Sequence, residues 1–196
     1  MNPYLRLVLD SNLDFNLDLW PVPVEWNAVV ATMGKLTNRM EVICAVTAAT
    51  MVLPLWESWQ GKKFTSFKKS PKEAVDITNR WLLGKTVKLS ELWSAEADAR
   101  NAADNATSDR WAAYAATSAA LAARAATSNT PASRAAQAVE AAAVASGAAA
   151  ISKSYEYRKD HEKVVVQQFY KDWWERCKPL LVEEYKRWSD WLGGAI

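Results

Sequence analysis

Two short stretches near the N-terminus alternate apolar and polar residues, at residues 4–9 and 13–19. A period of two is typical of a strand with one buried face. The apolar positions share a face within each stretch: Leu5, Leu7, Leu9, Leu13, Phe15, Leu17 and Leu19. The turn-forming residues Asp10-Ser11-Asn12 lie between the two stretches. The pattern predicts a small β-hairpin within residues 1–24. Its apolar face needs cover from helices or from a partner.

Beyond residue 24 the apolar residues recur at spacings of three and four, which is typical of helices with one buried face. Capping residues, prolines and glycines divide this pattern. Ser70-Pro71 begins one helix, Gly84 ends it, and Thr130-Pro131 begins another. The predicted helical segments are 25–60, 71–84, 90–128, 131–151 and 155–192.

The segment 25–60 is predicted to hold a short helix followed by a longer one. Asn38 and Glu41 have the spacing of a capping box, in which the two side chains satisfy free backbone N–H groups at a helix start. The longer helix is therefore expected to begin near Asn38. Pro54 lies within its apolar pattern and is expected to kink or end it.

Alanine dominates residues 95–150, where it accounts for 27 of 56 positions. Alanine is the strongest helix former and leaves a helix with little side-chain bulk, so such helices can pack closely but cannot fill a core alone. The chain also carries 11 Trp. We therefore predict one mainly all-α domain, a multi-helix bundle with alanine-rich central helices. The helices 90–128 and 131–151 form its antiparallel pair, and the Trp-rich helix 155–192 fills the groove of that pair.

Charge is nearly balanced over the whole chain, at +2, but it is concentrated in one segment. Residues 61–90 carry eight basic and two acidic side chains. Four lysines, Lys62, Lys63, Lys68 and Lys69, surround Phe64 and Phe67. This composition suits contact with a phosphate backbone or an acidic protein. The simpler interpretation is a solvated loop whose phenylalanines pack on the bundle.

Residues with catalytic or metal-binding chemistry are sparse. The chain has one histidine, His161, and two distant cysteines, Cys44 and Cys177, so a zinc site is not expected. It also has no Glu-x-x-His pair for a di-iron centre and no glycine-rich phosphate loop. We predict a protein that is not an enzyme and that has no catalytic, metal or cofactor site.

The environment of the two cysteines bears on the compartment. Cys44 and Cys177 lie in apolar helical stretches, and no secretory signal pattern precedes them. Two reduced, buried thiols in a cytoplasmic protein are therefore expected. The longest uncharged apolar run, residues 42–56, is shorter than the ~20 residues of a membrane span, so no membrane association is predicted.

Several stretches resemble the alanine-rich helical immunity proteins of bacterial polymorphic toxin systems. Residues 39–57, including Val52-Leu53-Pro54-Leu55-Trp56-Glu57, resemble the first helix of that family. Pro71-Lys72-Glu73-Ala74, followed by Trp81 and Gly84, resembles the second helix. The alanine tract with Asp98-Ala99-Arg100 resembles the third. The resemblance covers residues 39–150 and leaves out the N-terminal hairpin and the Trp-rich last helix.

The resemblance implies a non-enzymatic bacterial protein that binds a toxin or a defence effector by direct contact. The alternative is a nucleic-acid-binding accessory protein of an anti-phage system, for example of CRISPR type, that uses the basic loop 61–72. In either case the alanine tract is predicted to be scaffold, and recognition is expected on the hairpin, the lysine loop and the exposed ends. The candidate partner-binding residues are Asp14, Asp18, Trp20, Lys62, Lys63, Lys68 and Lys69.

Overall fold

The computed structural model of the chain describes residues 38–59, 70–106, 110–128, 131–153 and 158–193. Within these ranges it has helices and no strand. The helices are α3 (Asn38–Trp59), α4 (Ser70–Leu82), α5 (Leu89–Asn105), α6 (Arg110–Thr127), α7 (Pro131–Lys153) and α8 (Arg158–Gly193). The predicted all-α bundle is confirmed over this part of the chain. The predicted β-hairpin at 1–24 and the helical residues 25–37 lie outside the described residues.

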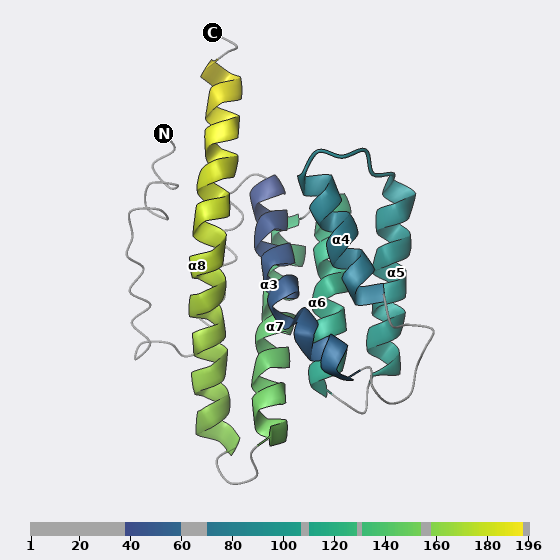
Figure 1. Ribbon diagram of the computed structural model, residues 1–196, viewed down its shortest axis with the longest axis vertical. Coiled ribbons are helices and arrows are strands. Elements are labelled where there is room, and N and C mark those ends of the chain that lie inside the picture. The colour runs from purple at the N-terminus through teal and green to yellow at the C-terminus, as the bar shows by residue number, and fades with distance from the viewer. Residues whose placement is uncertain (1–37, 60–69, 107–109, 129–130, 154–157, 194–196) are drawn as a thin grey trace.

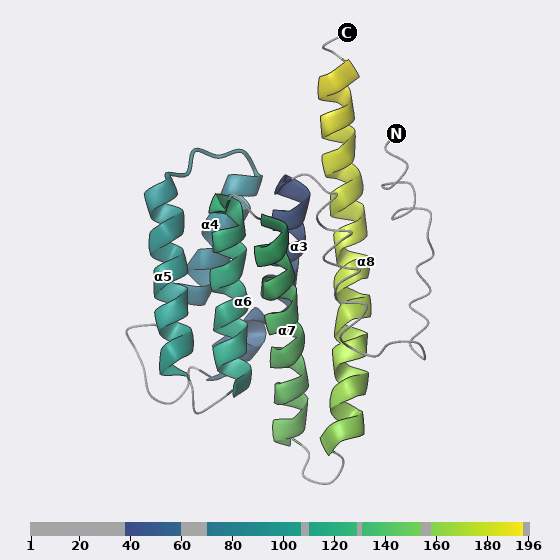
Figure 2. The ribbon, with the colours of Figure 1, turned by 180° about the vertical axis from the view of Figure 1, so that it is seen from behind.

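The helices run alternately up and down, from α3 to α8 (Figure 1). α6 lies at the centre and contacts α3, α4, α5 and α7. α4 and α5 cover one side of this centre, and α8 lies on the other side, where it contacts α7 and α3. The view from behind shows α7 between α6 and α8, with the C-terminal part of α8 extending past the end of the bundle (Figure 2).

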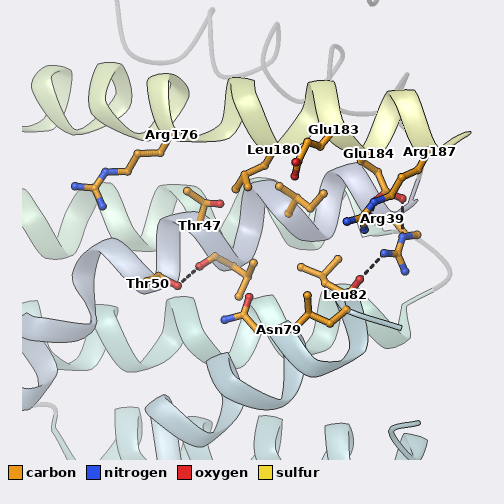
Figure 3. Close-up of a pocket in the computed structure, with 13 residues that line it drawn as sticks. Arg39, Thr47, Thr50, Asn79, Leu82, Arg176, Leu180, Glu183, Glu184 and Arg187 are labelled. Atoms are coloured by element: carbon orange, nitrogen blue, oxygen red, sulfur yellow. Dashed lines mark hydrogen bonds and ion pairs between the residues drawn. The ribbon is translucent and has the colours of Figure 1, made fainter. Parts of the chain in front are cut away.

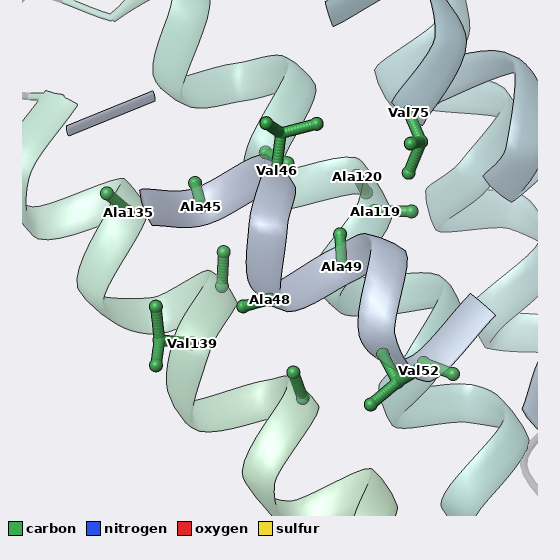
Figure 4. Packing of buried hydrophobic residues seen from close by; sticks show 14 of the residues in the cluster. Ala45, Val46, Ala48, Ala49, Val52, Val75, Ala119, Ala120, Ala135 and Val139 are labelled. Atoms are coloured by element: carbon green, nitrogen blue, oxygen red, sulfur yellow. The ribbon is translucent and has the colours of Figure 1, made fainter. Parts of the chain in front are cut away.

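Alanine forms the centre of the core, as predicted from its helix propensity and small volume. Figure 4 shows Ala48 and Ala49 of α3 packed among Ala119 and Ala120 of α6 and Val139 of α7. The close approach of α6 and α7 is held by a buried hydrogen bond, in which the hydroxyl of Ser118 donates to the carbonyl of Ala138 at 2.7 Å. Short side chains allow the helix backbones to come near enough for this bond.

The helix that covers the alanine pair is α3, which corrects the prediction for the last helix. α3 contacts both α6 and α7, whereas α8 contacts α7 and α3. α3 fits because its inner face is itself built of small residues, Ala45, Ala48 and Ala49, all of which are buried. The tryptophans of α8 are much larger than these side chains. Trp173 and Trp174 are buried in the same core cluster, where the indole of Trp173 donates to the carbonyl of Cys44 in α3.

The predicted helix 90–128 is wrong as a single helix, because the structure divides it into α5 and α6. α5 ends at Asn105, and the backbone N–H of Ala106 closes the last turn by donating to the carbonyl of Ala103 at 3.0 Å. The residues from Asn105 to Asp109 include Asn, Thr, Ser and Asp, which favour helix ends over helix interiors. The two halves contact each other along the bundle, so the alanine tract spans three helices.

Local end signals predicted the limits of α4 and α7. Gly84 has φ of 70°, the left-handed conformation that favours glycine at a helix end. The backbone N–H of Gly84 donates to the carbonyl of Trp81 at 3.0 Å, and the N–H of Lys85 donates to the carbonyl of Arg80 at 3.1 Å. These two bonds form the Schellman pattern. α7 begins at Pro131 as predicted.

The start of α3 differs from the predicted capping box. Asn38 is itself helical, whereas a cap residue lies just outside the helix, and Glu41 is buried with its Oε2 unbonded among the described residues. A capping glutamate lies at the helix surface with a solvated carboxylate. The carboxylate of Glu41 is buried, so the environment that the capping-box spacing predicted is wrong. Pro54 lies inside α3 without ending it, and the helix continues to Trp59.

Among the described helices, α3 is the one whose length and composition would let it cross a membrane. Of its most apolar window, 67% is buried inside the bundle. An apolar helix at the centre of a bundle needs the same composition, because neighbouring helices surround it on most sides.

Replacing Ala116 by leucine is expected to lower the free energy of unfolding by about 1–3 kcal/mol, because the added methylenes have no space between closely packed helices. Ala116 is fully buried. The matched control is Ala97→Leu at an exposed position of α5, which is expected to change stability by less than about 0.5 kcal/mol. Urea unfolding followed by circular dichroism measures both. Equal stability of the two variants would contradict the core described above.

Candidate functional site

The described residues hold no group of three or more histidine, cysteine, aspartate or glutamate side chains placed to bind a metal ion. The seven residues predicted for partner binding lie outside the described part of the chain: Asp14, Asp18, Trp20, Lys62, Lys63, Lys68 and Lys69. Those assignments therefore stay predictions. The most developed surface feature among the described residues is a groove that the sequence did not predict.

This groove lies between α3, α4 and α8 and has a volume of about 420 Å³ (Figure 3). We call it the α3–α4–α8 groove. Its residues come from one face of each helix, at helical spacings of three and four. They are Arg39, Ile43, Val46, Thr47 and Thr50 of α3, Asn79, Leu82 and Leu83 at the end of α4, and Arg176, Leu180, Glu183, Glu184 and Arg187 of α8. α3 supplies the floor, with α8 along one side and α4 along the other.

The inside of the α3–α4–α8 groove is apolar. Ile43 and Val46 form a buried floor. Leu180 on the α8 side is 43% exposed, and Leu83 on the α4 side is 67% exposed. Thr50 adds little polarity, because its hydroxyl donates to the carbonyl of Val46 in its own helix at 2.7 Å. The groove therefore offers apolar side chains that the described helices leave exposed.

One end of the α3–α4–α8 groove is tied together by Arg39. Its Nε donates to Glu184 Oε1 at 2.6 Å, and its Nη2 donates to the carbonyl of Leu82 at the end of α4. The guanidinium also lies over the ring of Trp81, 5.7 Å from the centroid. Arg187 adds a second cation, with Nη1 4.0 Å from Glu184 Oε2. Charges at this end are therefore satisfied within the protein, and Arg39 links three helices.

Along the side of α8, two charged residues are not engaged in this way. Arg176 and Glu183 are both exposed, and neither makes a hydrogen bond or ion pair with the described residues. They are seven residues apart, which is two helical turns or ~10.5 Å along the axis. Leu180 lies between them on the same face. α8 thus presents a cation, an apolar side chain and an anion in order along the groove.

A second depression, of about 370 Å³, lies between α4 and α5 and has a different character. Four carboxylates line it, those of Glu73, Asp76, Glu91 and Asp98, together with the single cation of Arg80. Such carboxylates are common on solvated helix surfaces. The apolar residues that line it are Ile77 and Ala95 alone, so this depression is a weaker candidate for a binding site than the α3–α4–α8 groove.

Cys44 of α3 and Cys177 of α8 meet at the interface behind the groove. Both are free and fully buried, so the predicted burial of the two thiols is confirmed. A hydrogen bond with Cys177 and burial together raise the pKa of the Cys44 thiol well above its usual value. A thiol held in its protonated form is a poor nucleophile. The pair therefore serves packing between α3 and α8.

Sequence reasoning missed the groove residues, although part of the signal was present. Residues 176, 180, 183 and 187 recur at helical spacings and mix charge with leucine, unlike the apolar stripe of Trp173 and Cys177 beside them. Such a mixed stripe indicates a face at the edge of the core. Comparison with protein-family models, curated proteins and solved structures finds no match to this chain.

Proposed function

We propose that this chain is a non-enzymatic bacterial protein that acts in the cytoplasm by binding a toxin or a defence effector through direct contact. The partner class comes from the sequence resemblance to immunity proteins over residues 39–150. The observation that carries the binding role is the α3–α4–α8 groove, where exposed Leu180 and Leu83 flank a buried apolar floor. Protein interfaces combine such an apolar centre with a polar rim, and arginine is enriched in them.

The groove supports binding more than it supports chemistry. Its ionisable groups are arginines and glutamates, of which Glu184 already pairs with both Arg39 and Arg187. A catalytic site needs a nucleophile or base held near an orienting group, and the groove contains no cysteine or histidine. Binding by direct contact, which the resemblance implies, requires an accessible surface and no reactive group.

The proposed function is tested by capture from the native host. The tagged full-length chain is expected to recover one protein at close to equimolar amounts, and nuclease treatment is expected to leave that partner bound. Loss of the partner on nuclease treatment would favour the alternative of nucleic-acid binding through the basic loop 61–72. Recovery of no protein above background, with and without crosslinking, would contradict the proposal.

A further inference from the structure

The shape of the α3–α4–α8 groove favours one kind of occupant. Its walls are helices, together with Leu83 just past the end of α4, and helices leave few backbone N–H and C=O groups free for a ligand. No sheet edge exists among the described residues. An extended peptide placed there would leave its own backbone N–H and C=O groups without partners in an apolar groove. A helix satisfies those groups internally and presents side chains alone. The groove therefore suits a helix.

The length of the groove fits a short helical segment. The lining residues of α3 extend from Arg39 to Thr50, which is 11 residue steps or ~16 Å along the axis. About three turns of a docked helix cover that distance. Recognition of an amphipathic helix by an apolar groove is a recurrent mode, in which anchors at spacings of three, four and seven residues enter the groove.

The charges of α8 define the chemistry of that helix. Arg176 and Glu183 are exposed and unpaired among the described residues, and Leu180 lies between them. Both helices rise ~10.5 Å in seven residues. On a docked helix that runs along α8, two side chains seven residues apart therefore face Arg176 and Glu183. Complementarity requires an acidic side chain opposite Arg176 and a basic one opposite Glu183. Like charges at these positions would repel.

We infer that the α3–α4–α8 groove binds an amphipathic helix of the partner protein. The helix inserts an apolar side chain between Leu180 and Val46. It carries an acidic and a basic side chain seven residues apart, facing Arg176 and Glu183. This inference rests on the proposed function, since it assigns the surface and the recognised element of the same partner. Arg39 and Glu184 hold α3, α4 and α8 in place around the docked helix.

The probe is a displayed library of amphipathic helical peptides of ~20 residues, with apolar anchors fixed and the flanking positions randomised. Selection against the immobilised full-length protein is expected to enrich an acidic and a basic residue seven positions apart beside the anchor. The double variant Arg176→Glu with Glu183→Arg is expected to enrich the reversed charge order. Leu180→Glu is expected to abolish enrichment. All three substituted side chains are exposed, so thermal unfolding should be unchanged.

Matched controls come from the same helix. Val164→Glu replaces an apolar side chain that is 60% exposed and does not line the groove, and Lys171→Glu reverses an exposed charge outside it. Both are expected to enrich the same peptides as the unmodified protein. Enrichment that is indifferent to the charge reversal, or no enrichment at all, overturns the inference. The inference is also overturned if the unmodified chain is a dimer and the Leu180→Glu variant is a monomer, because the occupant of the groove is then a second copy of the chain.

Failure of this inference differs from failure of the proposed function. If a host partner binds the Leu180→Glu variant as tightly as the unmodified protein, the proposed function stands, but the groove is not the binding site. If peptides are enriched in the expected charge order but no host protein is captured, the groove is shown to bind helices, and the proposed partner class is contradicted.

Discussion

Replacing Trp173 by alanine is expected to lower the free energy of unfolding by about 3–5 kcal/mol, the range for truncating a buried Trp or Phe. Trp173 is 2% exposed, and its indole Nε1 donates to the carbonyl of Cys44 at 2.9 Å. The substitution removes this link between α8 and α3 and leaves a cavity that the surrounding helices fill only in part. Urea unfolding followed by circular dichroism measures the change through the shift in midpoint.

Two controls separate the contributions of side-chain volume, hydrogen bonding and burial to the expected loss of stability. Trp173→Phe keeps an aromatic ring but loses the donor to Cys44, and its expected cost is smaller than that of Trp173→Ala. Trp93→Ala removes a tryptophan that is 53% exposed on α5, so its expected cost is much lower. A similar loss of stability in Trp93→Ala and Trp173→Ala would contradict the assignment of Trp173 to the core.

Replacing Glu41 by glutamine is expected to stabilise the protein at pH 8, by up to about 3 kcal/mol, and to have little effect near pH 4.5. Glu41 is 4% exposed, and its Oε2 has no hydrogen-bond partner among the described residues. Burial raises the pKa of its carboxyl from the ordinary value of 4.5 to about 7. Glutamine has the same shape and no charge to desolvate.

The direction of the pH dependence follows from that pKa. The folded protein holds the proton of Glu41 more tightly than the unfolded chain, so this group favours folding most below pH 4.5. Its contribution is lost as the pH rises from 4.5 to about 7, and it is constant above that. The stability difference between Glu41→Gln and the unmodified protein is therefore expected to grow over this interval.

The matched control is Glu57→Gln at an exposed carboxylate of the same helix. It is expected to show a small difference that does not change between pH 4.5 and 8. Unfolding curves in urea at several pH values give both comparisons. A difference for Glu41→Gln that stays constant over this range would show that its carboxyl is solvated in the folded protein.

The sequence predicted features that depend on a few adjacent residues. Gly84 and Pro131 mark helix limits that the structure shares, because backbone conformation at these positions is restricted locally. The break between α5 and α6 was missed, because alanine favours helix on both sides and outweighed the polar residues from Asn105 to Asp109. The burial of Glu41 was also missed, because a glutamate three residues after Asn38 can either cap the helix or lie on its buried face.

Features that depend on distant segments could not be predicted in the same way. Helical periodicity shows that Ala45, Ala48 and Ala49 share a face, but not that α6 and α7 receive that face in place of α8. The α3–α4–α8 groove joins residues 39–50, 79–83 and 176–187. Each stripe looks like an ordinary helix face in sequence. Whether a stripe is covered or open depends on the packing of all three helices.

The most direct test of the account is the affinity of the host partner for groove variants of the full-length protein. Isothermal titration is expected to show that Leu180→Glu weakens binding about tenfold or more, as at a central interface contact. Val164→Glu, at an exposed apolar position of the same helix, is expected to bind like the unmodified protein. Equal affinity of the Leu180→Glu variant and the unmodified protein would contradict the assignment of the α3–α4–α8 groove as the partner-binding site.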